Sequence, residues 1–242
     1  MRMGKRTTGK VIELLVLHDR LRVFRDRVHA GEILAGMLEN YRTSQTLVMA
    51  IPAGGIPVAA VLARTLTLPL DVAVVSKITL PWNTEAGYGA VAFDGTTRLN
   101  RDLLSRIRLS EGEIEEGKAA TAGKVERRVE RFRGNRPYPD LIRERVILVD
   151  DGLASGFTLL VGVEALKKSG AREIIVAVPT GSSSTVQRVA AEVDRLYCAN
   201  IRGGWSFAVA DAYERWTDVS EEEALRIYKS TTAARPETPG KG

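Results

Sequence analysis

The sequence predicts a three-layer α/β fold, with a mostly parallel sheet of about five strands covered by helices on both faces. Two observations predict it. Short apolar runs of strand length alternate with segments that have helical spacing, and Gly-rich turns follow two of the runs. This alternation is typical of strand–helix–strand units, whose sheet is buried on both sides. The chain of 242 residues, 44% of them hydrophobic, is long enough for one such domain.

The first part of the chain alternates between helix and strand. Residues 28–41 carry apolar side chains at helical spacing, and residues 46–51 form a continuous apolar run of strand length. A Gly-rich turn follows, and Pro57 stands where a first helical turn would begin. We therefore expect a helix at residues 58–66 and a second strand at residues 71–76.

A long insertion, at about residues 78–139, separates these strands from the rest of the sheet. It is expected to start with an irregular stretch at 78–83. A hairpin of residues 88–93 and 96–99 then turns at Asp94 and Gly95. A polar helix follows and begins at a capping box of Ser110 and Glu113. The basic stretch from Lys124 to Arg145 holds eight Lys and Arg and four acids. Its simplest interpretation is a solvated helix followed by a basic turn.

Strands alternate with helices again after the insertion. We expect strands at residues 145–149, 174–178 and 195–199, and helices that run to Lys168 and over residues 185–193. Ser220 and Glu223 indicate the start of a last short helix. Residues 231–242, rich in Thr, Pro and Gly, are expected to form a disordered tail.

Composition excludes several classes of protein. The 35 Lys and Arg exceed the 30 Asp and Glu by only five, which permits an anionic ligand but gives no reason to expect a nucleic-acid partner. One cysteine and two histidines cannot form an intrachain disulfide or a zinc site of the usual kind. Prolines interrupt the long uncharged run, and Glu13 interrupts the apolar N-terminal residues, so we expect neither a membrane span nor a signal peptide. A cytoplasmic protein fits these features.

The segment at residues 146–158, VILVDDGLASGFT, carries the strongest chemical signal. Four apolar residues end in Asp150 and Asp151, and a loop of small residues then leads into a helix. Ligands of open α/β sheets bind at this end of the strands. Free N–H groups at the helix start favour a phosphate, to which Ser155 and Thr158 can add hydroxyl donors. The two carboxylates would repel that phosphate unless they bind vicinal sugar hydroxyls, Mg²⁺, or both.

This segment closely resembles the phosphoribosyl pyrophosphate motif of the type I phosphoribosyltransferases. The resemblance implies that Asp150 and Asp151 bind the ribose hydroxyls, and it makes them the candidate ligands of the Mg²⁺ that comes with the substrate. The residues implied to bind the 5-phosphate are Ala154, Ser155, Gly156, Phe157 and Thr158. The resemblance covers about residues 24–228 and implies one domain of this family.

Two further segments are similar to the family's pyrophosphate site. The turn AIPAGGIP resembles the pyrophosphate loop, with Ala53, Gly54 and Gly55 as the residues whose N–H groups face the leaving group. Lys77 resembles the basic residue that reaches the pyrophosphate, where it would offset the charge that develops on departure. The alternatives are an ordinary tight turn and a solvated lysine.

The remaining parts of the family are implied more loosely. Residues 78–99 fall at the place of the flexible catalytic loop, so Glu85 and Tyr88 are candidates to approach the substrate, or else solvent-facing loop residues. Residues 200–228, with the N-terminal segment, fall at the place of the hood that recognises the acceptor base. Its candidates for stacking on a base are Trp205 and Phe207, then Tyr213 and Trp216, and the alternative is a core or dimer contact.

Three residues depart from the family's pattern. Phe157 stands where relatives often have Gly, which preserves the N–H donor if its φ angle is negative. Ala154 stands where the hypoxanthine-guanine enzymes carry an acid, which speaks against a 6-oxopurine acceptor. Ala53 stands where the branch of the family that this chain most resembles tends to carry Arg, and the loss of that cation weakens the expected binding of pyrophosphate.

The resemblance implies a cytoplasmic, dimeric enzyme of nucleotide salvage. It would transfer the 5-phosphoribosyl group from phosphoribosyl pyrophosphate to a nitrogenous base and release pyrophosphate, with Mg²⁺ as cofactor. Ala53 and the basic stretch motivate an alternative, a non-catalytic sensor of phosphoribosyl pyrophosphate or a nucleotide on the same fold. A third alternative is an unrelated sugar-phosphate or nucleotide enzyme with a similar sheet.

Overall fold

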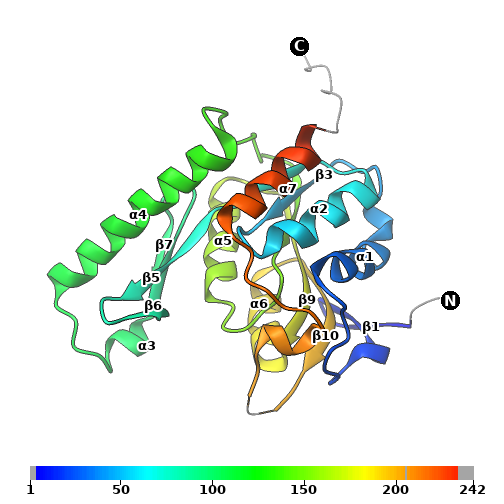
Figure 1. Ribbon diagram of the computed structural model, residues 1–242, viewed down its shortest axis with the longest axis horizontal. Helices are drawn as coiled ribbons and strands as arrows, with labels where there is room; N and C mark the ends of the chain where they lie inside the picture. The colour runs from blue at the N-terminus through cyan, green and yellow to red at the C-terminus, as the bar shows by residue number, and fades with distance from the viewer. Residues whose placement is uncertain (1–3, 205, 234–242) are drawn as a thin grey trace.

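The computed structural model describes residues 4–204 and 206–233 and contains two sheets (Figure 1). In that part of the chain the central sheet has seven strands, in the order β1-β2-β10-β9-β8-β3-β4. Their bounds are β1 Lys5–Thr8, β2 Val11–Leu14, β3 Thr46–Ala50, β4 Leu70–Val72, β8 Arg145–Val149, β9 Glu173–Ser182 and β10 Arg195–Arg202. All neighbouring strands are parallel except β1 and β2. The expected α/β fold with a mainly parallel sheet is therefore confirmed.

Helices cover both faces of the central sheet. α1 (Arg27–Met37), α2 (Gly55–Leu66) and α7 (Glu221–Ala233) lie on one face, and α5 (Phe157–Lys168) and α6 (Ser183–Glu192) lie on the other. Side chains alternate between the two cores along β3, since Val48 and Ala50 pack with the first group and Met49 with the second. The strands are continuous apolar runs because both faces are covered. No described helix combines the length and the apolar character that a bilayer crossing requires.

A second, antiparallel sheet projects from the central sheet as an arm, at the left of Figure 1. The arm comprises β5 (Val75–Leu80), β6 (Asn83–Ala92), β7 (Thr97–Leu99), α3 (Arg101–Leu104) and α4 (Glu111–Arg133). The expected hairpin is present, with Gly95 at φ +83° and its N–H donating to Ala92 O at 2.9 Å. The expected capping box is present too, because Glu113 N donates to Ser110 Oγ at 3.2 Å and Ser110 N donates to Glu113 at 2.8 Å.

Three expected elements differ in the structure. The helix expected at 28–41 ends at Met37 and is followed by a separate 3-10 turn, η2 (Glu39–Tyr41). The strand expected at 71–76 is divided, because the chain leaves the edge of the central sheet after Val72 and enters the arm at Val75. Residues 78–83, expected to be irregular, belong to β5, a turn and β6, and the pairing of β5 with β6 shifts register on either side of Thr79. Their proline lies in the turn itself, where its missing N–H costs no ladder hydrogen bond.

The structure also extends the sheet and the last helix. β1 and β2 precede residue 24 and join the sheet, although no side chain of β1 (KRTT) is apolar, because the β1–β2 pairing needs only the backbone. α7 continues to Ala233, with Thr231 only 8% exposed, so residues 231–233 of the expected disordered tail are helical. The rest of that expected tail lies outside the described residues.

A buried ion pair joins the arm to the central sheet. Arg133, the last residue of α4, has a side chain that is 3% exposed, and it donates to Asp71 of β4 and to Pro137 O. Asp71 also accepts from the Tyr228 hydroxyl of α7 at 3.1 Å. The Arg133 guanidinium lies 4.0 Å from the centre of the Tyr138 ring. Elements β4, α4 and α7 therefore meet at one charged contact at the base of the arm.

We expect Asp71→Asn to destabilise the fold by about 3–5 kcal/mol, since it leaves the Arg133 charge buried without its partner. Urea unfolding followed by circular dichroism measures this change. The matched control is Glu192→Gln, which breaks the pair with Lys167, where the side chains are 51% and 48% exposed. It should cost less than about 1 kcal/mol. Equal effects of the two variants would show that the buried pair does not hold the base of the arm.

Candidate functional site

The two Gly-rich turns singled out in the sequence meet at the carboxyl edge of the central sheet. β3 and β8 are parallel neighbours, so the loops that follow them leave the sheet side by side, and Ile51 N donates to Val149 O at 2.9 Å. A Cβ atom on Gly54 would lie 2.2 Å from Asp151 Oδ2, and one on Gly55 would lie 2.7 Å from Val149 O. Glycine at both positions is therefore what allows the loops to approach this closely.

Asp150 follows β8 directly and reaches solvent through the cavity that it lines. Its Oδ1 accepts the N–H of Asp151 at 2.9 Å. Burial, and then the neighbouring charge of Asp151, raise the pKa of Asp150 well above its ordinary value, while the charges of Arg27 and Lys77 lower it. Among the described residues Asp150 forms no ion pair, so a hydroxyl donor or a cation from a ligand would satisfy its free oxygen.

Asp151, in contrast, is paired. Arg27 Nη2 lies 2.8 Å from Asp151 Oδ2, and Arg27 Nε donates to the same oxygen at 2.9 Å. The Tyr213 hydroxyl donates to the Asp151 carbonyl at 2.6 Å. Burial raises the pKa of Asp151, and the charge of Arg27 opposes that shift. Its carboxylate also lies against Gly54, where the loops after β3 and β8 meet.

The loop after the acids leads into α5 through a left-handed residue. Gly156 has φ +67°, and a Cβ atom there would lie 2.6 Å from Thr185 Cγ2, so this position requires glycine. Phe157 begins α5 and is not among the residues with positive φ, which is the condition for keeping its N–H as a donor. Thr185 Oγ1 donates to Ala154 O at 2.7 Å and fixes the loop, while Ala154 and Ser155 stay exposed. The amides at the start of α5 suit an anion, although Phe157 N already donates to Ser155 Oγ at 3.4 Å.

A cavity of about 300 Å³ lies between this edge of the sheet and the arm. Its lining residues are Ile51, Pro52, Val75, Ser76, Lys77, Thr79, Lys124, Arg128, Asp150 and Thr158. Three of them are cations: Lys77 comes from β5, and Lys124 and Arg128 come from α4. The arm thus presents positive charge toward an acid and the first turn of α5, an arrangement that suits a polyanion with a polar sugar.

The sequence did not indicate that Lys124 and Arg128 belong to the site. Arg128 donates to Ser76 Oγ at 3.2 Å and lies 3.5 Å from Glu221 Oε1, and burial lowers its pKa. The two residues stand four positions apart on α4 and so share one face of the helix. That spacing was visible in the sequence, but Arg127 and Arg131 have the same spacing. Only the packing of α4 on β5 decides which pair lines the cavity.

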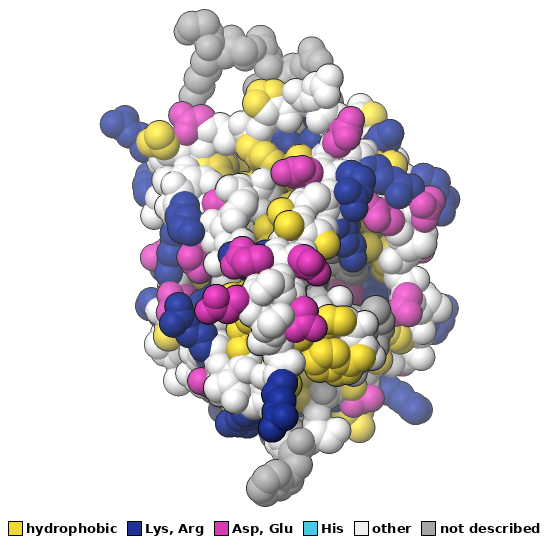
Figure 2. Space-filling model, turned by 90° about the vertical axis from the view of Figure 1, so that its left-hand side faces the viewer, with side chains coloured by type: hydrophobic (Ala, Val, Ile, Leu, Met, Phe, Trp, Pro, Cys, Tyr) yellow, Lys and Arg dark blue, Asp and Glu magenta, His cyan; other side chains and the backbone are white. Residues whose placement is uncertain are grey.

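Four of the six other arginines of the basic stretch at 124–145 have an ion-pair or hydrogen-bond partner among the described residues. Besides the contact of Arg133 with Asp71, the pairs are Arg131 with Glu222 at 2.6 Å, Arg136 with the Tyr228 hydroxyl at 3.3 Å and Arg145 with Glu173 at 2.5 Å. Figure 2 looks onto the arm and shows Lys and Arg interspersed with Asp and Glu. This face therefore lacks, among the residues drawn as described, the continuous basic surface typical of nucleic-acid binding.

The two candidates from the expected flexible loop lie in the sheet of the arm. Glu85 belongs to β6, and its side chain lies outside the described part of the structure. Tyr88 is 1% exposed, and a Cβ atom on Gly117 of α4 would lie 2.0 Å from its hydroxyl. Burial raises the pKa of Tyr88. Contrary to expectation, Tyr88 packs between β6 and α4 and does not approach the cavity, because the small residue on α4 admits its ring.

The aromatic residues of the 200–228 segment differ in their surroundings. Trp205 lies outside the described residues. The Phe207 ring lies 4.4 Å from the Arg202 guanidinium and is partly exposed, so it can still reach a ligand. Tyr213 is 3% exposed, and Trp216 lies under the guanidinium of Arg27 at 3.9 Å. Both rings therefore support the Arg27–Asp151 pair. Tyr213 is too buried to stack on a base, whereas Trp216 is partly exposed, like Phe207.

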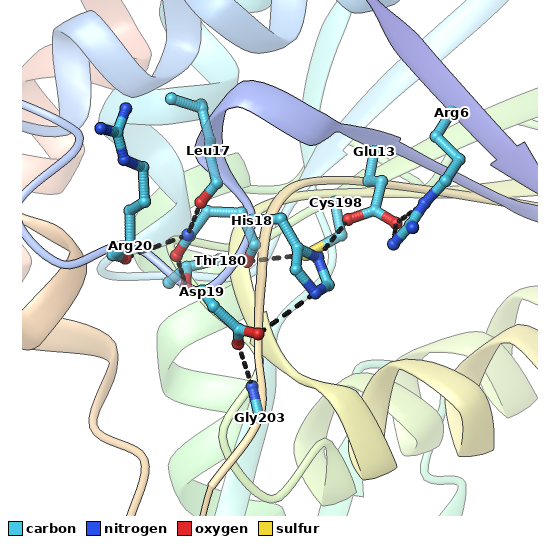
Figure 3. Close-up of polar contacts among 10 residues, drawn as sticks. Arg6, Glu13, Leu17, His18, Asp19, Arg20, Thr180, Cys198 and Gly203 are labelled. Carbon is cyan, nitrogen blue, oxygen red and sulfur yellow. Dashed lines mark hydrogen bonds and ion pairs between the residues drawn. The ribbon is translucent and has the colours of Figure 1, made fainter.

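The N-terminal segment runs beside the 200–228 segment. Phe24 N donates to Ala212 O at 3.0 Å, and Glu214 N donates to Phe24 O at 2.7 Å. Farther along, the polar contacts in Figure 3 join the same two segments, since Gly203 N donates to Asp19 Oδ1 at 2.6 Å. His18 Nδ1 lies 2.7 Å from Glu13 Oε2 in the same group. Residues before the expected domain start therefore help to hold the segment that follows β10.

Comparisons with known proteins show the family of the chain. The family model for the phosphoribosyl transferase domain matches residues 27–212. The chain therefore belongs to this family. Two curated relatives from Mycobacterium tuberculosis, provisionally named phosphoribosyl transferases, are 33% identical over 205 residues, which cover 85% of this chain and 46% of each relative. The chain spans about half the length of these relatives. The solved structure of TT1426 from Thermus thermophilus is 31% identical, with a TM-score of 0.70, and the match covers 87% of this chain and 99% of that one.

The burial of Asp150 leads to a prediction about stability. The pKa of Asp150 is higher in the folded protein than its ordinary value of 3.8, so folding favours the protonated carboxyl. The stability that this carboxyl contributes is fully present below pH 3.8 and is lost as the pH rises through the folded pKa. We expect Asp150→Asn to stabilise the fold at pH 7 by roughly 0.5–2 kcal/mol, and to give a smaller gain at pH 4. Urea unfolding at the two pH values measures this difference.

The control for that experiment is Glu126→Gln on the exposed side of α4, which should change stability by less than about 0.5 kcal/mol at either pH. If Asp150→Asn gives no gain at pH 7, the buried carboxylate does not weaken the fold. If it gives the same gain at pH 4, the gain does not come from the charge.

Proposed function

We propose that this protein transfers the 5-phosphoribosyl group from phosphoribosyl pyrophosphate to a nitrogenous base and releases pyrophosphate. One observation carries the proposal: the Asp150–Asp151 pair lies between a helix start that suits a phosphate and a Gly-rich loop at a cation-lined cavity. Such a cleft matches a molecule with phosphate at one end, hydroxyls in the middle and diphosphate at the other end. Membership of the phosphoribosyl transferase family supports the reaction class.

The substrate is proposed to lie along this cleft. The amides of residues 154–158 and the Thr158 hydroxyl hold the 5-phosphate. Asp150 and Asp151 accept the ribose hydroxyls, with Asp151 using Oδ1 because Oδ2 receives Arg27. These contacts fix the anomeric carbon relative to both the leaving group and the acceptor, which lowers the entropic part of the barrier.

The diphosphate is proposed to lie against the loop at Ala53, Gly54 and Gly55 and to be neutralised from the arm. The bond from the anomeric carbon to pyrophosphate breaks as the acceptor nitrogen attacks from the opposite side, so negative charge accumulates on the leaving group. Lys77, together with Lys124 and Arg128 of α4, stabilises that charge. The cations of α4 thereby replace the arginine that is absent at Ala53.

Mg²⁺ is proposed to enter with the substrate. The Asp150 carboxyl suits a hard divalent ion, since Asp150 lines the cavity and no described cation pairs with it. Among the described residues no group of three or more potential metal ligands occurs. When bound, the ion supplies further positive charge at the diphosphate.

The acceptor site is proposed to lie under the 200–228 segment, with Phe207 as the candidate for stacking on the base. Ala154 provides no acid for the N7 of a 6-oxopurine, which favours another purine, a pyrimidine or a related acceptor. A cytoplasmic homodimer that acts in nucleotide salvage completes the proposal.

Incubation with phosphoribosyl pyrophosphate, Mg²⁺ and a panel of bases tests the reaction, with pyrophosphate release as the readout. We expect Asp150→Asn and Asp151→Asn each to lower kcat/KM by roughly 10- to 100-fold, the loss of one or two charge-assisted hydrogen bonds. Circular dichroism shows whether each variant is folded. Stabilisation of the fold by phosphoribosyl pyrophosphate without turnover would favour the sensor, and the absence of both binding and turnover would refute the proposal.

The cationic face of α4 gives a separate prediction. Lys124→Gln should weaken binding of pyrophosphate by about fivefold at low salt and by less at 0.5 M salt, because screening already reduces the contribution of an exposed charge. Calorimetric titration with magnesium pyrophosphate measures both values. The matched control is Arg127→Gln, an exposed residue of the same helix that does not line the cavity. Equal weakening by both variants would mean that only the net charge of α4 matters.

A further inference from the structure

Arg27, the first residue of α1, reaches the candidate ribose site. Its side chain is 9% exposed, and both Nε and Nη2 contact Asp151 Oδ2, at 2.9 Å and 2.8 Å. The remaining terminal nitrogen, Nη1, donates to Thr217 O at 2.7 Å. A buried guanidinium needs partners for its donors, and here they come from a site acid on one side and the 213–217 segment on the other.

The aromatic rings of the same segment hold Arg27 in place. Its guanidinium lies 3.9 Å from the centre of the Trp216 ring and 6.0 Å from that of Tyr213. Tyr213 in turn donates to the carbonyl of Asp151 at 2.6 Å. The 213–217 segment therefore contacts Asp151 twice, once through the carbonyl and once through Arg27 to the carboxylate.

A second ion pair ties the start of α1 to this segment. Asp26 caps α1, accepting from His29 N at 3.0 Å, and its other carboxylate oxygen lies 2.6 Å from Arg215 Nη2. Neighbouring residues of one helix start thus bind the segment in two different ways. The Asp26 pair is exposed, with Arg215 74% exposed, whereas the Arg27 pair is buried beside the cleft.

We propose that Arg27 is a positioning residue that holds the Asp151 carboxylate for ribose and couples it to the 213–217 segment on the acceptor side. This inference rests on the proposed function. With Oδ2 held by two nitrogens of the planar guanidinium, the Asp151 carboxylate is restricted, and Oδ1, which has no other partner among the described residues, is the oxygen left to accept from a ligand. A ribose hydroxyl then meets an acceptor that is already oriented, so the ligand does not lose binding energy in ordering it.

Arg27 thus acts through Asp151 and does not touch the substrate. Lysine keeps the charge but cannot form the planar two-nitrogen contact or the same stack on Trp216. We therefore expect Arg27→Lys to raise both the Kd and the KM for phosphoribosyl pyrophosphate by about tenfold, with kcat within about twofold. A poorly oriented Asp151 weakens the binding of ribose in the ground state and the transition state alike. Calorimetry with magnesium present gives Kd, and initial rates give KM and kcat.

A double-mutant cycle separates positioning from a merely structural role. If Arg27 works through Asp151, adding Arg27→Lys to Asp151→Asn should change the Kd by less than about twofold. Arg215→Gln is the matched control, since it removes the exposed pair of the same segment and should leave the Kd unchanged. Unfolding curves identify any variant that is not folded, and Arg27→Gln serves as a second substitution if the lysine variant is not.

A readout without ligand tests the link to the segment. In Arg27→Lys, hydrogen exchange should become faster in the 213–217 segment and in the loop after β8, and Arg215→Gln should leave the loop after β8 unchanged. Weakening of binding by equal factors in the wild-type and Asp151→Asn backgrounds would overturn the inference. So would an unchanged Kd in Arg27→Lys. If the unmodified protein does not bind phosphoribosyl pyrophosphate, the proposed function fails, and the inference fails with it.

Discussion

The close approach of two loops at the carboxyl edge of the sheet is the constraint on which the site depends. Gly54 leaves no room for even one carbon atom beside the Asp151 carboxylate, and Gly55 leaves none beside the backbone of β8. Because β3 and β8 are parallel neighbours, these loops must emerge at one place. The absence of two side chains therefore creates the cleft, and the residues around the cleft supply its chemistry.

Charge is balanced across this cleft by elements that are distant in the sequence. Two adjacent carboxylates at the end of a buried strand repel each other and lose hydration. α1 opposes this with Arg27, and the arm opposes it with Lys77 and two residues of α4. The arm can do so because a buried ion pair fixes its base to β4 and α7. Stability at the base of the arm and charge in the cavity are thus two consequences of one arrangement.

Local patterns predicted the parts of the fold that local physics controls. The hairpin at Gly95, the capping box at Ser110 and the buried strands β3 and β8 follow from turn geometry, side-chain hydrogen bonds and apolar runs. The prediction of one strand at 71–76 is wrong, because a continuous apolar run does not show where a chain passes from one sheet to another. β1 was missed because backbone pairing with a neighbour holds it, without a contribution from apolar side chains.

The sequence by itself determined the acids, the glycines and the start of the helix that follows them, because each depends on residues within one short segment. Only the tertiary structure decided that α4 lines the cavity, that Tyr88 is buried under α4, and that Arg27 holds Asp151 across 124 positions of the chain. Contacts between distant segments depend on how whole elements pack, and the residue types along one segment do not contain that information.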